Sequence, residues 1–151
     1  MAETRLFEAT LGIEAPWFVR EAAFDAKGRT LTIAVDFIPG SRFGHPEVAG
    51  EHPAHVTVAK RYRHLNFFQH ECFLEVRVPR VKLSDGSTRQ IEPAWGGRLA
   101  GFTLLFEVLI LAFCREMPFR ALARLTGVRA CTVSGPVRAL RGACHRPAGS
   151  F

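Results

Sequence analysis

The chain has 151 residues, 48% apolar and 23% charged, enough for one substantial core or two small ones but too few for three domains. Its most apolar stretch, residues 99–113, contains Glu107 and falls short of the roughly 20 residues that span a bilayer, so no membrane partner is expected. The amino terminus carries charges where a secretory signal has an apolar run, which predicts a cytoplasmic protein.

The net charge of +6 is concentrated at the carboxyl end. No acidic residue follows Glu116, whereas six arginines do. Such a block favours a polyanionic partner, because each guanidinium placed on a phosphate releases a condensed counterion. The alternative is a solvated basic tail without a partner. The six residues are Arg120, Arg124, Arg129, Arg138, Arg141 and Arg146.

The first half of the chain is predicted to form strands after one short helix. A turn of helix at residues 6–11 precedes two β-rich runs, residues 17–24 and 30–37. The turn-forming residues 25–28 join these runs into a hairpin. Large apolar residues alternate with smaller or polar ones along the second run, as expected for a strand with one buried face.

A proline-, glycine- and histidine-rich segment, residues 39–56, is predicted to be an ordered loop, because it suits neither a helix nor a β-ladder. Strands resume at residues 61–67 and 70–83, and a turn leads into a short return strand at residues 88–92. In the run 70–83, the apolar residues 72, 74, 76 and 78 alternate with residues 73, 75 and 77, which gives this strand a period of two. Pro79 should mark an edge or a bulge, since it cannot donate to the ladder. We therefore expect an α+β protein whose residues 1–93 form a small antiparallel β module.

Helices follow a hinge at residues 94–97. An apolar helix at residues 102–116 should end before Pro118, and a shorter helix at residues 119–125 precedes Gly127, which suits a left-handed helix end. We assign residues 98–134 to a helical module. Residues 135–151 are predicted to be an irregular, disordered basic tail.

The segment 119–128 has the pattern of the first half of a helix-turn-helix. Ala123 is small where a second helix must approach closely, Gly127 suits the turn, and Val128 can fill the interface. The following residues 129–134 could begin a recognition helix, which Gly135 and Pro136 would interrupt. This interpretation makes four residues candidate DNA contacts: Arg120, Arg124, Arg129 and Thr132.

A second candidate DNA surface is the run of residues 60–70, in which basic and aromatic residues are interleaved. A strand of this kind can hold a phosphate backbone and stack bases. Arg61 and Arg63 are its candidate phosphate contacts. Leu65, Phe67 and Phe68 are interpreted as core residues.

Three histidines, His45, His52 and His55, are the only clustered candidate metal ligands, and Glu47, Glu51 or Asp85 could complete a site. A solvated loop is the favoured interpretation. The four cysteines, at positions 72, 114, 131 and 144, form no CxxC pair and are interpreted as free thiols. No P-loop, nucleophile elbow or HExxH motif is present, so no catalytic residue and no cofactor are predicted.

Four segments resemble a known family: residues 61–72 (RYRHLNFFQHEC), 76–81, 101–107 and 115–118. They look like the amino-terminal region of insertion-sequence transposases of the ISL-three family, and the likeness covers about residues 4–128. The resemblance implies a zinc-ribbon-like β module and a helix-turn-helix, which together recognise the terminal inverted repeats of the element. In the family a DDE-type catalytic domain follows, which this chain is too short to contain.

The chain departs from the family at two places. Residues 45–48 and 83–86 stand where the family has CPxC knuckles, so the usual cysteine ligands for zinc are absent. Sequence beyond Val128 resembles an out-of-frame translation, which suggests a truncated or frameshifted copy.

Three hypotheses follow. The first is a non-catalytic transposase portion that binds double-stranded DNA at the element ends. The second is a stand-alone regulator that blocks the intact transposase by occupying those ends or by pairing with it, or with itself, through the apolar helix. The third is a small metal-dependent enzyme that uses the histidine loop.

Overall fold

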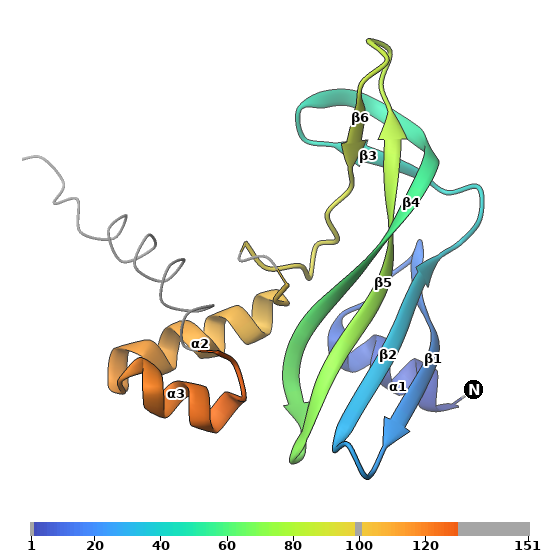
Figure 1. The fold of residues 1–151 in the computed structure, drawn as a ribbon. Coiled ribbons are helices and arrows are strands. Elements are labelled where there is room, and N and C mark those ends of the chain that lie inside the picture. Colours follow the sequence, from blue (N-terminus) through green and yellow to red (C-terminus); the bar gives the residue numbers. More distant parts are fainter. Residues whose placement is uncertain (1, 99–100, 130–151) are drawn as a thin grey trace, which may run out of the picture. The chain divides into compact units, whose positions relative to one another are not determined.

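The structure is a computed structural model that describes residues 2–98 and 101–129. These residues form an α+β protein with a mixed six-stranded sheet and three helices, in two compact units that divide between Leu105 and Phe106 (Figure 1). Within the described ranges, no helix has the length and apolar character required to cross a bilayer. The elements are α1 (Ala2–Leu11), β1 (Trp17–Asp25), β2 (Thr30–Phe37), β3 (Arg42–His45), β4 (Val48–Phe67), β5 (His70–Lys82), β6 (Thr88–Gln90), α2 (Leu104–Glu116) and α3 (Phe119–Thr126).

The sheet corrects the prediction of a simple antiparallel module. Its strand order is β1-β2-β5-β4-β3, with β6 also paired to β5. Strands β1 and β2 form the predicted hairpin, but β5 inserts between β2 and β4 and runs parallel to β2, with Leu31 opposite Cys72 and Val35 opposite Val76. Alternation reveals which face of a strand is buried and not the direction of its neighbour, so the sequence could not disclose this pairing.

The predicted loop at residues 39–56 is also wrong, because β3 and the first part of β4 occupy most of it. His45 pairs with Val48 across the turn at Pro46 and Glu47, and Pro53 lies opposite Arg42. Strand β3 has four residues and lies at the end of the strand order. Prolines are tolerated in such a short peripheral ribbon, because it contains few ladder hydrogen bonds that a missing N–H could remove.

Pro79 lies in a central strand, in unbroken register with β4, rather than at the edge or bulge that we predicted. On one side of β5, Pro79 lies opposite Thr57 of β4. On the other side, β5 pairs with β2 up to Val76 and with β6 from Arg80 onward. The Pro79 carbonyl accepts a hydrogen bond from the Ile91 N–H at 3.0 Å. The missing proline N–H therefore falls in the gap between β2 and β6, where it interrupts no ladder.

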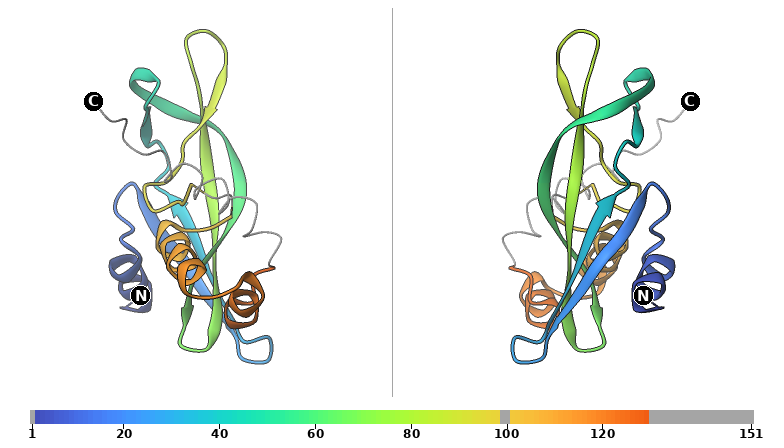
Figure 2. Two further views of the ribbon diagram at one scale, coloured as in Figure 1. Left: turned by 90° about the vertical axis from the view of Figure 1, so that its left-hand side faces the viewer. Right: turned by 90° about the vertical axis from the view of Figure 1, so that its right-hand side faces the viewer.

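The main core lies on one face of the sheet, and α1 packs against it (Figure 2). The alternating residues Cys72, Leu74, Val76 and Val78 of β5 are each at most 3% exposed, as predicted from their period of two. Each fully buried aliphatic side chain contributes about 1.5 to 3 kcal/mol relative to exposure. The unit that ends at Leu105, called the β unit below, thus has a substantial apolar core of its own. This core also includes Leu31, Ile33 and Val35 of β2, Ile13, Val19 and Tyr62, with Phe7 and Leu11 of α1 packed against it.

Candidate nucleic-acid interface

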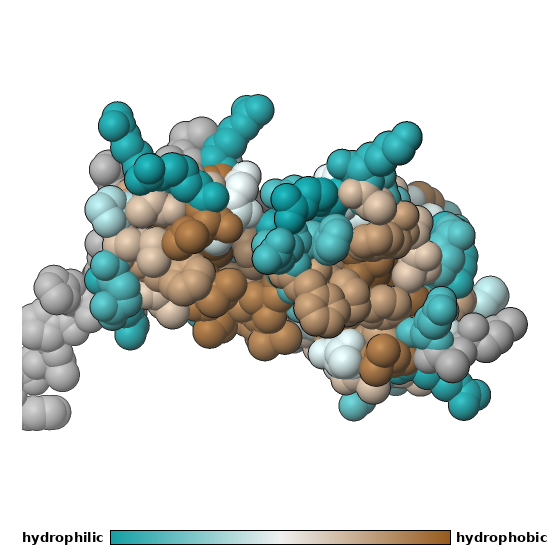
Figure 3. Space-filling model, turned by 90° about the horizontal axis from the view of Figure 1, so that it is seen from below, coloured by the Kyte–Doolittle hydropathy of each residue, from teal (hydrophilic) through white to brown (hydrophobic). Residues whose placement is uncertain are grey.

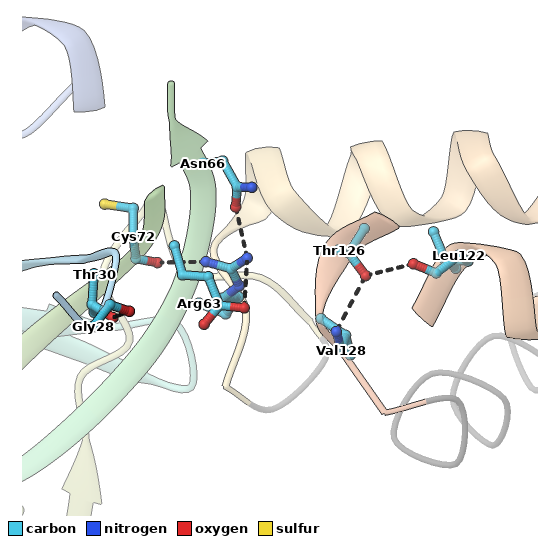
Figure 4. A network of polar contacts seen from close by, with 9 residues as sticks. Gly28, Thr30, Arg63, Asn66, Cys72, Leu122, Thr126 and Val128 are labelled. Atoms are coloured by element: carbon cyan, nitrogen blue, oxygen red, sulfur yellow. Dashed lines mark hydrogen bonds and ion pairs between the residues drawn. The ribbon is translucent and has the colours of Figure 1, made fainter. Parts of the chain in front are cut away.

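Helix α3 has one buried face and one basic face. Leu122 is fully buried and Thr126 is 7% exposed, and the Thr126 hydroxyl donates to the Leu122 carbonyl at 2.8 Å (Figure 4). Arg120 and Arg124 are exposed and four residues apart, so they share one side of the helix, roughly opposite Leu122. Because Leu122 and Thr126 occupy the buried face of α3, both guanidinium groups lie on its exposed face.

The end of α3 has the predicted geometry. Gly127 adopts a left-handed conformation with φ 71°, and its N–H donates to the Ala123 carbonyl at 2.9 Å. The Val128 N–H donates to the Thr126 hydroxyl at 3.3 Å (Figure 4). This cap holds the chain at the helix terminus, and Arg129 is exposed two residues beyond Gly127.

Three arginines lie on α3 or just beyond its end. In the described residues no ion pair involves Arg120, Arg124 or Arg129, and α3 contains no acidic residue. Thr132 and the rest of the predicted recognition helix lie outside the described residues, as does the predicted basic tail. The structure therefore shows α2 and α3 but not a complete helix-turn-helix.

Arg61 is exposed on β4, and its guanidinium carbon lies 4.1 Å from the centroid of the Phe73 ring on β5. This geometry allows a cation–π interaction. It also occupies one face of Phe73, so that face is not free to stack on a base. The Arg61 side chain can contact phosphate from this position while Phe73 supports it.

Arg63 is in a different environment, since it is only 6% exposed. Its guanidinium donates to the Asn66 side-chain oxygen at 2.6 Å and to the Cys72 carbonyl at 3.4 Å (Figure 4), and it lies 3.8 Å from a Glu71 carboxylate oxygen. Burial lowers the pKa of Arg63, and Glu71 opposes that shift. These contacts favour a structural role for Arg63 in joining β4 to β5.

We expect Arg63→Met to lower the free energy of unfolding by about 2 kcal/mol, because the guanidinium bonds to the Asn66 side chain and the Cys72 carbonyl are lost together. Urea denaturation measures this change. The control Arg61→Met removes an exposed guanidinium and should cost less than about 1 kcal/mol. A stable Arg63→Met variant with weakened DNA binding would instead identify Arg63 as a phosphate contact.

The aromatic tip of the β4–β5 hairpin corrects another prediction. Phe68 is 84% exposed and Phe67 is 39% exposed, so neither is a core residue. Phe68 occupies the hairpin turn with φ 55°, and its ring packs against Phe67 at a centroid separation of 4.9 Å. Apolar side chains are exposed elsewhere too, and Figure 3 shows them in brown beside hydrophilic ones on one face.

The three candidate metal-binding histidines lie on β3 and β4. The His45 Nδ1 accepts a hydrogen bond from the Glu47 N–H at 3.2 Å, His52 is half-buried, and His55 is exposed. Asp85 lies in the β5–β6 turn, where it accepts hydrogen bonds from the Ser87 N–H and hydroxyl. Across the described ranges, no three histidine, cysteine, aspartate or glutamate side chains come together as a metal site would require.

Sequence reasoning missed two cations that join Arg61 on the outward face of the sheet. Arg20 of β1 and Arg77 of β5 line a groove of about 400 Å³ with Arg61, and Arg77 forms a 2.9 Å ion pair with Asp36. Alternation along β5 already placed Arg77 on the face opposite Val76. The order of the strands, which brings β1 and β4 to either side of β2 and β5, was the missing information.

Comparison with known proteins identified no relative for this arrangement. No protein-family model, curated protein or solved structure matches the chain.

Proposed function

We propose that this chain binds double-stranded DNA and is the DNA-recognition portion of an insertion-sequence transposase without its catalytic domain. The observation that carries the proposal is the basic face of α3, where Arg120 and Arg124 project side by side without an acidic partner in the described residues. Arg129 extends this basic surface beyond the helix cap. On this proposal the chain catalyses no reaction by itself.

The chemistry of this surface suits a phosphate backbone. An arginine on an exposed helix face can reach a phosphate without losing an internal ion pair, and its fork of donors matches the phosphate oxygens. Arg61, which Phe73 supports from below, is a further candidate contact on the sheet. Sequence discrimination would require base-edge contacts in a groove, which we assign to residues 129–134.

The transposase assignment is supported by the resemblance of residues 61–72, 76–81, 101–107 and 115–118 to the ISL-three family. It makes the terminal inverted repeat of the element the proposed DNA target. The family's zinc is not part of the proposal, since its cysteine ligands are missing from residues 45–48 and 83–86.

A regulator of transposition is the second candidate function, and the exposed side of α2 favours it. Leu104, Leu105 and Val108 are 43%, 51% and 56% exposed on a helix with few charged residues. Such a surface can pair with the intact transposase. This function predicts that the chain inhibits transposase activity even when repeat DNA is in large excess.

To test DNA binding, the affinity of the purified full chain for a duplex that carries the inverted repeat is measured at increasing salt concentration. Three phosphate contacts predict a fall of roughly 40-fold between 50 and 200 mM salt, because each contributes about 0.9 to the logarithmic slope. Fluorescence anisotropy with a labelled duplex measures it. Unchanged affinity across this range would contradict a phosphate-driven mechanism, and equal affinity for a shuffled duplex would contradict recognition of the repeat.

A further inference from the structure

One edge of β4 faces away from β5. The Arg63 N–H donates to the Gly101 carbonyl at 2.7 Å, and the Arg63 carbonyl accepts from the Thr103 N–H at 3.0 Å, so both backbone groups of Arg63 point away from β5. The β4–β5 register is continuous from Val56 to His64. Because backbone groups alternate in direction along a strand, Thr57, Ala59 and Arg61 also direct their N–H and carbonyl groups away from β5.

This edge has no strand partner in the described part of the chain. Among the described residues, β3 pairs with β4 only from Val48 to Pro53, and no backbone hydrogen bond reaches Thr57, Ala59 or Arg61 from that side. Three successive outward positions therefore offer alternating donors and acceptors. Such a row is a template for an added strand.

The next position along the same edge already accepts an extended segment. Phe102 forms a parallel bridge with Arg63, and both hydrogen bonds of that bridge are made. Among the described residues this pairing stops at Gly101, whose φ of 80° turns the backbone out of the extended conformation. The edge geometry is thus suitable for strand addition, and the chain itself uses it once.

A groove of about 680 Å³ lies alongside this edge, and its charge is predominantly positive. Lys60, Arg61 and Arg98 line it, with Glu92 as the acidic member. Glu92 is already engaged, since it lies 3.0 Å from the Lys60 ammonium and 3.3 Å from the Tyr62 hydroxyl. Burial and Glu92 together raise the pKa of Tyr62, so this hydroxyl stays protonated and able to donate.

We infer that the β4 edge at residues 57–61 binds an acidic peptide in extended conformation, which adds to the sheet as a further strand. The main-chain groups supply the hydrogen bonds, and Arg61 and Arg98 select acidic side chains by charge. A second copy of this chain is a poor occupant, because pairing two such edges would bring their arginines together. The inference shares Arg61 with the DNA-binding function proposed above but does not rest on that function, because the main-chain bonds and Arg98 have no part in it.

The experiment uses the full chain and a fluorescein-labelled seven-residue peptide in which glutamate alternates with valine, with a lysine-for-glutamate peptide as the control. Anisotropy should show binding of the acidic peptide only. Arg98→Glu should weaken it at least tenfold, whereas Lys27→Glu, the same charge change in the β1–β2 turn, should leave it unchanged. Hydrogen exchange of the Thr57, Ala59 and Arg61 amides should slow when the peptide is present.

Ala59→Pro removes one outward N–H without removing a bond to β5, and should weaken binding of the acidic peptide at least tenfold. Two peptides N-methylated at complementary sets of alternate amides test the same point without altering the protein: one set should abolish binding and the other preserve it. Equal loss with both sets, or binding without slower exchange at these three amides, would overturn strand addition. Binding of a single-stranded oligonucleotide that depends on Arg98 but not on Ala59 would identify a phosphate groove instead.

Discussion

Replacing Arg120 and Arg124 together by glutamine should weaken duplex binding by roughly 10- to 60-fold at 0.1 M salt and reduce the logarithmic salt slope by about two. The two residues share an exposed helix face and form no ion pair among the described residues. Their replacement should therefore lower the affinity for DNA without destabilising the fold. The measurement is a salt titration of affinity by fluorescence anisotropy, with urea denaturation to verify unchanged stability.

The matched control removes two cations elsewhere in the chain. Arg5 on α1 and Lys27 in the β1–β2 turn are exposed, and their replacement by glutamine lowers the net charge by the same amount. The control should change the slope by much less than two. Equal effects of the two double variants would show that DNA responds to total charge alone, which would remove α3 as the interface.

The stability of the β unit should fall by about 3 kcal/mol as the pH is lowered from 6.5 to 4, because of His64. Burial, and then the neighbouring Arg63, lower the pKa of His64 from 6.5 to about 4. Over this window the unfolded chain binds a proton that the folded chain does not, so acid favours unfolding. Well above pH 6.5, His64 is neutral in both states and its contribution is fully retained.

Urea denaturation of the full chain at pH 7, 5.5 and 4 measures this loss. His64→Gln should lose most of the pH dependence within the window, since glutamine can retain a hydrogen bond to the Thr103 hydroxyl, now 2.7 Å from the His64 Nδ1, but does not titrate. His55→Gln, at an exposed position of the same strand, should leave the dependence intact. A pH dependence that survives in His64→Gln would assign it to other groups.

Local patterns predicted most elements, because their determinants are local. The period of two in β5, the turn after Asp25 and the left-handed Gly127 each depend on a few neighbouring residues, and the structure confirms all three. The insertion of β5 beside β2 depends on contacts between residues about forty positions apart. Proline content also misled the interpretation of residues 39–56, since a short peripheral ribbon tolerates prolines that a central strand would not.

In the candidate site, too, features that depend on nearby residues were predicted and features that depend on distant contacts were not. Helical spacing placed Arg120 and Arg124 on one face, and the structure exposes both. Arg61 and Arg63 were both candidate phosphate contacts and are two positions apart on β4, yet Arg61 is exposed and Arg63 is only 6% exposed. Arg63 differs in its contacts with residues distant in sequence, because it lies near Glu71 and the Phe73 ring of β5 and bonds through its backbone to Gly101 and Thr103.

The gap at Pro79 separates the neighbours of β5 into two groups. Residues 71–76 are held by β2, and residues 80–82 are held by β6, while β4 accompanies both. Local opening can therefore release the β6 ribbon without breaking the parallel ladder, so the two ends of one continuous strand can differ in protection from solvent.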